Sequence, residues 1–142
     1  MKVTANKVIS GTWGSVTVDG VEIAEISALQ AKVSYTKEEV QMARQMGVDQ
    51  KITGYKCTGS LTLKKVFTRF AEFADAIKQG KDMRATVISH LEDPDAYGAE
   101  RVALYNVSLD DLTLADWAAG KTQEVTVPFT FTDWEYLSKV VC

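Results

Sequence analysis

The sequence predicts a mainly β domain with one α-helix, arranged as a small antiparallel β-barrel or sandwich. Two long stretches of alternating polar and apolar residues lie between 21 and 63, and one amphipathic helix follows them. Further alternating stretches fill the chain from 83 onward. At 142 residues, with no linker, repeat or low-complexity tract, the chain is expected to form a single domain over residues 1–142.

The N-terminal region is expected to begin with an extended arm over residues 1–14, because its polar residues alternate and it contains two glycines. It lacks the apolar core of a signal peptide. Asp19-Gly20 then predicts a tight hairpin turn after a strand at Val16–Val18. The next strand, 21–36, changes phase midway, which predicts a bulge or bend where one strand serves two packed surfaces.

Polar residues interrupt the strand pattern at Lys37–Asp49, before a second long strand from Gln50 to Leu63. A connection of this length is commonly functional or disordered. A projecting two-stranded ribbon is marginal by itself, so we expect a neighbouring subunit to supply its packing. The candidate inter-subunit residues are the apolar members of this loop and one tryptophan of the arm: Val40, Met42, Met46, Val48 and Trp13.

One helix is predicted over residues 66–80, because apolar residues follow the i, i+3, i+4, i+7 pattern and Gly80 provides a C-terminal stop. Its apolar stripe consists of Phe67, Phe70, Ala71, Ala74 and Ile77. Strands are predicted at 83–92 and 101–115, separated by a turn. Both faces of residues 102–109 are apolar, which predicts a central strand.

The last predicted strand alternates cleanly between an apolar and a polar face. Its apolar face consists of Val125, Val127, Phe129 and Phe131. The other face is rich in threonine and nearly free of charge. Pro128 lies on this polar face and has no N–H, so the strand is expected at a sheet edge or at a bulge.

The two long strands also carry polar faces with few charges, which fit either the hydrophilic wall of a channel or an ordinary solvated sheet face. The candidate lumen-facing residues are Gln30, Lys32, Ser34, Thr36, Lys56, Thr58, Ser60 and Thr62. The three tryptophans fit core burial and subunit contact equally well. They are Trp13, Trp117 and Trp134.

No arrangement of residues predicts catalysis, so we expect a non-enzyme without catalytic, cofactor-binding or metal-binding residues. His90 has no partner at a diagnostic spacing. The cysteines, Cys57 and Cys142, are too few and too separated for a metal site or disulfide framework, and a reducing cytoplasm is the simplest compartment. The net charge of −3 does not suggest a general nucleic-acid-binding surface.

The C-terminal block TQEVTVPFTFTDWEY, at 122–136, follows a Leu-Thr-Leu-Ala-Asp-Trp segment at 112–117 and an Ala-Gly-Lys segment at 119–121. Together these segments resemble the C-terminal part of the tail tube proteins of contractile phage tails. They are also similar to core tube proteins of phage-like particles and R-type tailocins from Gram-positive bacteria. The resemblance extends over the whole chain and points to a structural polymer.

The resemblance implies hexameric rings whose long strands join into one inner barrel, stacked into a rigid tube inside a contractile sheath. Residues 37–49 and the N-terminal arm would contact adjoining subunits or rings, and Glu72 and Asp75 of the helix would face the sheath. The implied partners are further copies of the chain, the sheath protein, the baseplate and tail-terminator proteins, and a tape-measure protein in the lumen. DNA would pass through where the particle is a phage tail.

The resemblance further implies assembly in the bacterial cytoplasm, without a role in a membrane, and release by lysis as part of a phage tail or bacteriocin particle. Two other functions remain compatible with the sequence. One is the tube of another contractile injection or secretion system. The other is a monomeric β-barrel that binds a small ligand.

Overall fold

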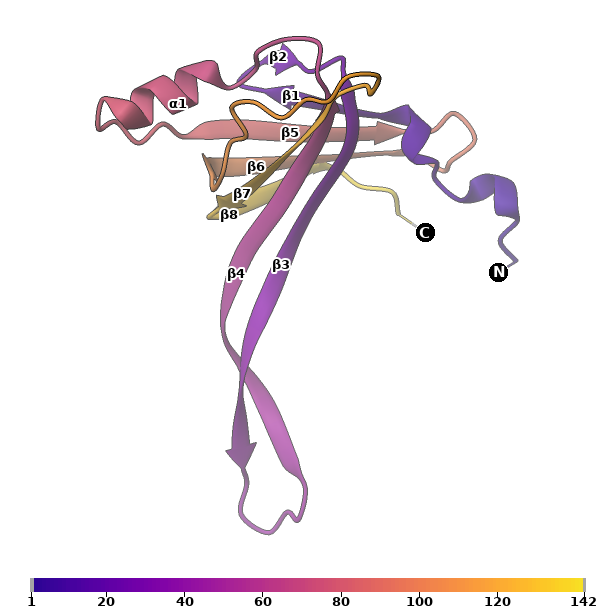
Figure 1. Ribbon diagram of the computed structural model, residues 1–142. Coiled ribbons are helices and arrows are strands. Elements are labelled where there is room, and N and C mark those ends of the chain that lie inside the picture. The colour runs from indigo at the N-terminus through magenta and orange to yellow at the C-terminus, as the bar shows by residue number, and fades with distance from the viewer. Residues whose placement is uncertain (1, 142) are drawn as a thin grey trace.

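The computed structural model describes residues 2–141, which form eight β-strands, one α-helix and two short 3₁₀ helices (Figure 1). Cys142 lies outside the described residues. The elements are η1 (Ala5–Lys7), η2 (Gly11–Trp13), β1 (Gly14–Val18), β2 (Val21–Glu22), β3 (Ile26–Gln41), β4 (Val48–Lys64), α1 (Ala71–Lys78), β5 (Ala85–Glu92), β6 (Ala99–Leu109), β7 (Glu124–Phe131) and β8 (Asp133–Ser138).

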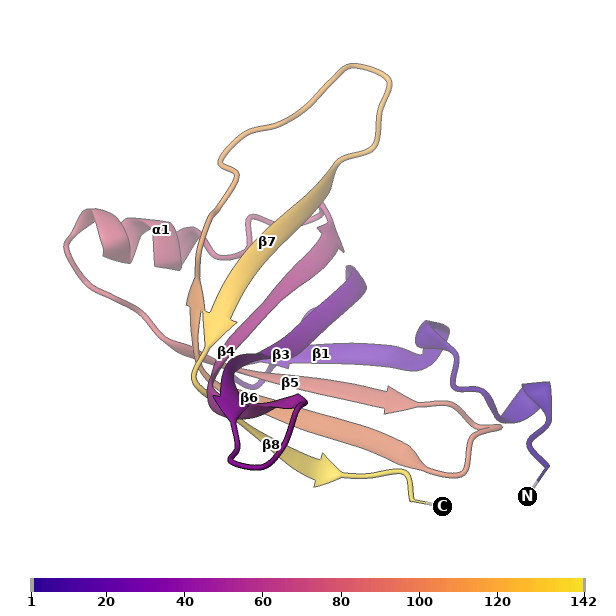
Figure 2. The same ribbon diagram turned by 90° about the horizontal axis from the view of Figure 1, so that it is seen from below.

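The strands form two antiparallel sheets that share β6. We call β2, β1, β5, β6 and β8 the body sheet, and the end of β6 with β7, β4 and β3 the hairpin sheet. Most of β6 pairs with β5 and β8, whereas Ser108 and Leu109 pair with β7. The two sheets diverge like the arms of a V (Figure 2). The predicted central strand is therefore confirmed.

The corner between the sheets is set by Asn106, whose φ of 57° is in the left-handed region. Thr132, between β7 and β8, turns the same corner on the neighbouring strand. Asn106 Nδ2 donates to Thr132 Oγ1 at 3.2 Å, and the Thr132 N–H donates to the Tyr105 carbonyl at 3.3 Å. These bonds hold the two bends together and so fix the angle between the sheets.

The prediction of a mainly antiparallel β fold with one α-helix is confirmed, but the strands do not close into a barrel. β2 and β3 stand at opposite ends of the strand order and do not pair with each other. The fold is therefore an open wedge, nearer to the predicted sandwich than to a closed barrel.

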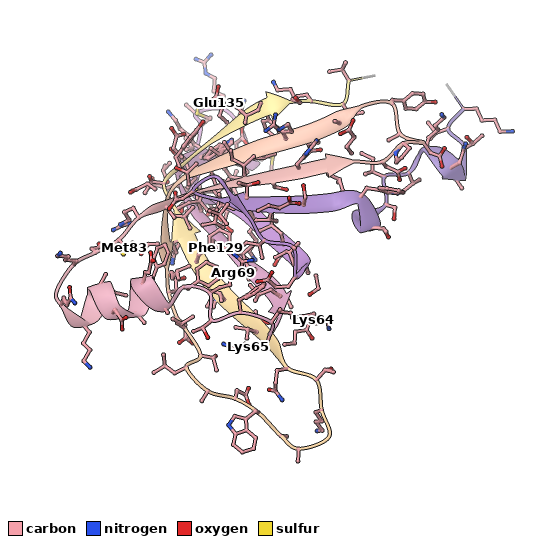
Figure 3. The ribbon with its side chains drawn as sticks, turned by 90° about the horizontal axis from the view of Figure 1, so that it is seen from above. Lys64, Lys65, Arg69, Met83, Phe129 and Glu135 are labelled. Atoms are coloured by element: carbon pink, nitrogen blue, oxygen red, sulfur yellow. The ribbon has the colours of Figure 1, made fainter. Side chains whose placement is uncertain are left out.

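The core lies between the two sheets, at the corner where they meet. Phe129 is completely buried there, and Figure 3 shows it where the sheets meet. The clustered core residues are Val16, Cys57, Leu61, Val87, Leu104, Val107, Phe129 and Phe131. Val127 is also fully buried, so the apolar face predicted for β7 does point inward.

Strands β3 and β4 form a long hairpin that projects from the body, and it is more regular than predicted (Figure 1). Pairing continues to Gln41 opposite Val48, so the loop is Met42–Gly47 and the prediction of an irregular segment from Lys37 is wrong. The polar residues after Thr36 carry no alternation that sequence reasoning could detect. Backbone pairing with β4 makes them a strand nonetheless.

Two β-bulges interrupt this hairpin, one on each strand. Ser27 is the extra residue on β3, and Thr53 is the extra residue on β4. The first bulge explains the change of phase predicted for 21–36, because it brings Ile26 onto the same face as Leu29. The single strand predicted over 21–36 is wrong, because β2 ends at Glu22 in the body sheet and a separate strand, β3, begins at Ile26 in the hairpin sheet.

The Asp19-Gly20 turn is confirmed: both residues have positive φ, 49° and 85°, as a type I′ hairpin requires. The arm before β1 is not extended as predicted, since it contains η1 and η2. Ser10 N–H donates to Asp93 Oδ2 at 2.9 Å, and Asp93 is only 8% exposed. A buried carboxylate of the β5–β6 turn therefore holds the arm against the body.

The helix predicted from Val66 begins later, at the start of α1. Phe70, directly before it, has a φ of 64°, and this left-handed conformation cannot belong to a regular helix. The predicted apolar stripe is wrong at both ends, because Phe67 and Ile77 are 58% and 62% exposed. Phe73 is the large buried side chain of α1 instead. No helix within residues 2–141 is long and apolar enough to span a bilayer.

The segment before α1 is tied to the start of β3 by an ion pair. Arg69 Nη2 donates to Glu25 Oε2 at 3.0 Å, and Arg69 Nε donates to Glu25 Oε1. The Glu25 side chain is 4% exposed. These hydrogen bonds, assisted by the positive charge of Arg69, hold the pKa of Glu25 below its ordinary value of 4.5. The charged pair therefore stabilises the folded chain.

Acid should weaken the stabilisation that the ion pair between Arg69 and Glu25 gives to the folded chain. Because the folded pKa of Glu25 is depressed, its stabilisation is fully present above about pH 4.5 and is lost as the pH falls through the folded value. Unfolding of the wild type and Glu25→Gln should be measured at pH 6 and pH 3. The difference in their free energies of unfolding should be larger at pH 6. An equal difference at both pH values would contradict this assignment.

Gly59 should tolerate no side chain. A Cβ there would lie 2.6 Å from Phe129 Cζ and would also strike the Gln30 carbonyl. Gly59→Ala should therefore lower the free energy of unfolding by roughly 1–3 kcal/mol through overpacking. The matched control is Gly54→Ala on the same strand, where nothing lies within 4 Å of the new methyl group. Chemical denaturation of both variants measures the difference, and similar stabilities would refute the close contact.

Candidate functional site: a polar sheet face and its free edges

The structure brings the predicted lumen-facing residues onto one face of the hairpin sheet. In the β3–β4 register, Gln30 lies opposite Ser60 and Lys32 lies opposite Thr58. Residues directly opposite in a sheet share a face. The remaining members join the same face in the pairs Ser34 with Lys56, Thr36 with Gly54, and Ala28 with Thr62.

Strand β7 extends this surface, which we call the polar face. Thr126 and Thr130 lie opposite Thr62 and Thr58 of β4, and the Thr62 and Thr126 hydroxyl oxygens are 3.4 Å apart. At the start of β7, Lys64 Nζ lies 3.6 Å from Glu124 Oε1. The opposite face of the same strands packs into the core. The hairpin sheet thus presents hydroxyl groups on one side and apolar side chains on the other.

Two free edges bound the polar face. β3 pairs only with β4 and ends the strand order, so its other side has no partner strand among the described residues. At the opposite edge, β6 leaves β7 after Leu109. Pro128 lies at this point, where its carbonyl accepts from the Asp110 N–H at 2.9 Å. On the β6 side, Pro128 therefore has the predicted edge position. On the other side, all of β7 pairs with β4.

The distal half of the hairpin exposes apolar side chains. Met46 is fully exposed at the loop, and Met42 and Val48 are each 51% exposed, whereas Val40 is half-buried. Sequence reasoning missed three further exposed residues of this region, although their apolar character in a strand was a usable signal: Tyr35, Ile52 and Tyr55. An isolated chain leaves this surface in water, which is typical of a contact surface.

The tryptophans divide between core and surface. Trp134 packs against the core, and its ring meets that of Tyr55 edge-on with centroids 5.4 Å apart. Trp13 and Trp117 are 53% and 77% exposed. Trp13 belongs to η2, beside the body sheet, and lies apart from the hairpin loop (Figure 1).

The remaining predicted residues, Glu72 and Asp75, are exposed on α1. The helix lies at the end of the molecule opposite the hairpin loop (Figure 1). A partner that contacts α1 would therefore not meet the hairpin loop of the same chain.

The described residues offer little for chemistry. His90 Nε2 lies 3.3 Å from Glu92 Oε2 at a partly exposed position on β5. Burial raises the pKa of the Cys57 thiol, which disfavours the thiolate form. Within residues 2–141, no group of three or more histidine, cysteine or acidic side chains could hold a metal ion.

Comparison with known proteins gives a consistent result. Residues 1–138 match the family model described as phage tail tube protein. The chain is 34% identical to the phage-like element PBSX protein XkdM of Bacillus subtilis strain 168, over 99% of this chain and 97% of that protein.

Two solved structures share the fold at low sequence identity. The tube-terminating cap of the anti-feeding prophage has a TM-score of 0.76 at 9% identity, covering 98% of this chain and 97% of that chain. The sheath–tube complex of an extracellular contractile injection system in its extended state has a chain with a TM-score of 0.71 at 12% identity, covering 97% of this chain and 100% of that chain.

The free chain should be less protected in the distal hairpin than at its base. Lys37–Gln41 and Val48–Ile52 pair with each other but bury almost no side chain, whereas Cys57, Leu61 and Leu63 are buried. Amide hydrogens of the distal segments should therefore exchange faster in the isolated protein. Hydrogen exchange resolved by residue measures this, and equal protection along β4 would contradict it.

Proposed function

Because the chain belongs to the phage tail tube protein family, we propose that it is a structural subunit of the inner tube of a contractile tail. In this proposal the chain assembles into hexameric rings, and the rings stack into a hollow conduit. Contraction of a surrounding sheath drives the conduit through a target envelope. The chain acts by shape and contact rather than by catalysis.

The observation that carries the proposal is the polar face in an open sheet. A monomeric protein gains nothing from a broad hydroxyl-rich face that ends in a free strand edge as long as β3. If copies join edge to edge, the polar faces become the continuous wall of a lumen. A hydrophilic wall gives a passing cargo no apolar surface to adhere to.

Ring closure would also satisfy the free strand edges. Head-to-tail contacts use two different surfaces of each copy, here β3 on one side and the end of β6 with β7 on the other. Repetition around an axis leaves neither edge of the hairpin sheet unpaired, as in a closed barrel. The barrel that the single chain lacks would then belong to the ring.

Stacking would use surfaces outside the polar face. We assign the distal hairpin within residues 37–49 and the arm with Trp13 to contacts with adjoining subunits or rings. Support comes from their exposed apolar side chains, among them Met42, Met46 and Val48. Burying these residues against a neighbour would remove apolar surface from water.

The outer surface would carry α1, with Glu72 and Asp75 directed toward the sheath. Support comes from their exposure and from the separation between α1 and the hairpin loop (Figure 1). Baseplate and terminator proteins would meet the two ends of the tube, and a tape-measure protein would occupy the lumen, with DNA following in a phage tail. Assembly would take place in the bacterial cytoplasm, before release by lysis as part of the particle.

The open sheet argues against a monomeric β-barrel that binds a small ligand. Such a barrel encloses its ligand by closing the sheet. Here β2 and β3 are separate ends of the strand order, and the hollows between β3 and the body sheet are open rather than enclosed by a closed barrel.

The proposed function is tested by negative-stain electron microscopy of the purified protein across a concentration series, with particle mass measured in parallel. We expect rings or hollow tubes with a central lumen, either spontaneously at high concentration or after addition of a preformed baseplate. Compact monomers at every concentration, with the baseplate present, would refute the proposal.

A further inference from the structure

The polar face carries charges of opposite sign at its two edges. Lys32 lies on the edge strand β3, opposite Thr58, and it is exposed. Asp110 lies at the other edge, directly after β6, and is also exposed. Its carboxylate accepts from Thr130 Oγ1 at 3.4 Å and its N–H donates to the Pro128 carbonyl at 2.9 Å, so it continues the line of β6 on the polar face.

These two charges cannot meet within one chain. β4 and β7 lie between β3 and the end of β6. Three strand spacings separate the edges by ~14 Å, which is too far for an ion pair. The salt bridges found among residues 2–141 involve neither Lys32 nor Asp110. Both side chains are therefore available for an ion pair with a partner outside their own chain.

We propose that Lys32 of one copy forms an ion pair with Asp110 of the neighbouring copy, and that this pair sets the register of β3 against the end of β6. The inference rests on the proposed function, because it requires copies to join edge to edge. The partner surface is thus a second copy of the chain, selected by charge complementarity across the joint.

Sheet geometry limits the registers that this pair would accept. Side chains alternate between faces, so only shifts by an even number of residues keep the polar face polar. Gln30, Ser60, Pro128 and Asp110 lie in line across the sheet. If Gln30 of one copy lay directly opposite Asp110 of the next, Lys32 would lie diagonal to that Asp110. The long lysine side chain would then reach the carboxylate.

A stagger of two residues in one direction would place these residues directly opposite, and closed barrels require some stagger. Larger shifts would break the contact. The other charges of the polar face do not serve this role, since Lys64 pairs with Glu124, Lys56 lies on β4 behind the β3 edge, and Glu38 and Lys51 face each other in the distal hairpin. Lys56 is instead a matched control with the same charge on the same face.

The test is assembly of charge variants of the full chain, measured by sedimentation and electron microscopy at low salt. Lys32→Glu and Asp110→Lys should each raise the concentration needed for half-assembly about tenfold or more, because like charges then face each other. The double exchange should restore assembly. A 1:1 mixture of the two single variants should also assemble, since alternation in an even-numbered ring brings opposite charges to every joint.

Lys56→Glu should assemble like the wild type, and thermal unfolding should be unchanged in all variants. Wild-type rings with unaffected single variants would overturn the ion pair while leaving the proposed function intact. Loss of assembly without rescue by the double exchange would also overturn it. A wild type that forms no rings under any condition would overturn both the proposed function and this inference.

Discussion

The fold depends on the pairing of one strand with two sheets. β6 belongs to the body sheet along most of its length and to the hairpin sheet at its end, with the bend at Asn106 between them. If β6 continued straight, β7 would lie in the plane of the body sheet and the core would have only one wall. The bend creates the space that Phe129 fills. It also turns the polar face away from the body.

The hairpin sheet is well packed only where the body supports it. At its base, Gly59 lets the β3 backbone and the Phe129 ring approach closely, and the apolar faces of β4 and β7 are buried. Farther out, the strands rely on their own backbone hydrogen bonds, a weak arrangement for an isolated two-stranded ribbon. The chain therefore combines a well-packed body with a distal hairpin, and the distal hairpin is the part that contact with another chain would stabilise most.

Sequence reasoning recovered the features that depend on local periodicity. The inward face of β7 and the shared face of the candidate lumen residues follow from a period of two, and the turn at Asp19-Gly20 follows from its Asp-Gly pair. It failed where backbone geometry overrides the side-chain pattern, as at Phe70, whose left-handed conformation delays α1. Asp110 was missed as a candidate because its role depends on strands that are distant in sequence.

The bulge at Thr53 decides which side chains a passing molecule would meet. Without the bulge, with Thr53 paired regularly, Ile52 and Val48 would keep the parity of Lys56 and would fall on the polar face. With it, Ile52 lies opposite Lys37 on the other face, and Glu38 faces Lys51 on the polar side. The same residues in a strand without this irregularity would thus turn apolar side chains toward a passing molecule, with no change in amino-acid composition.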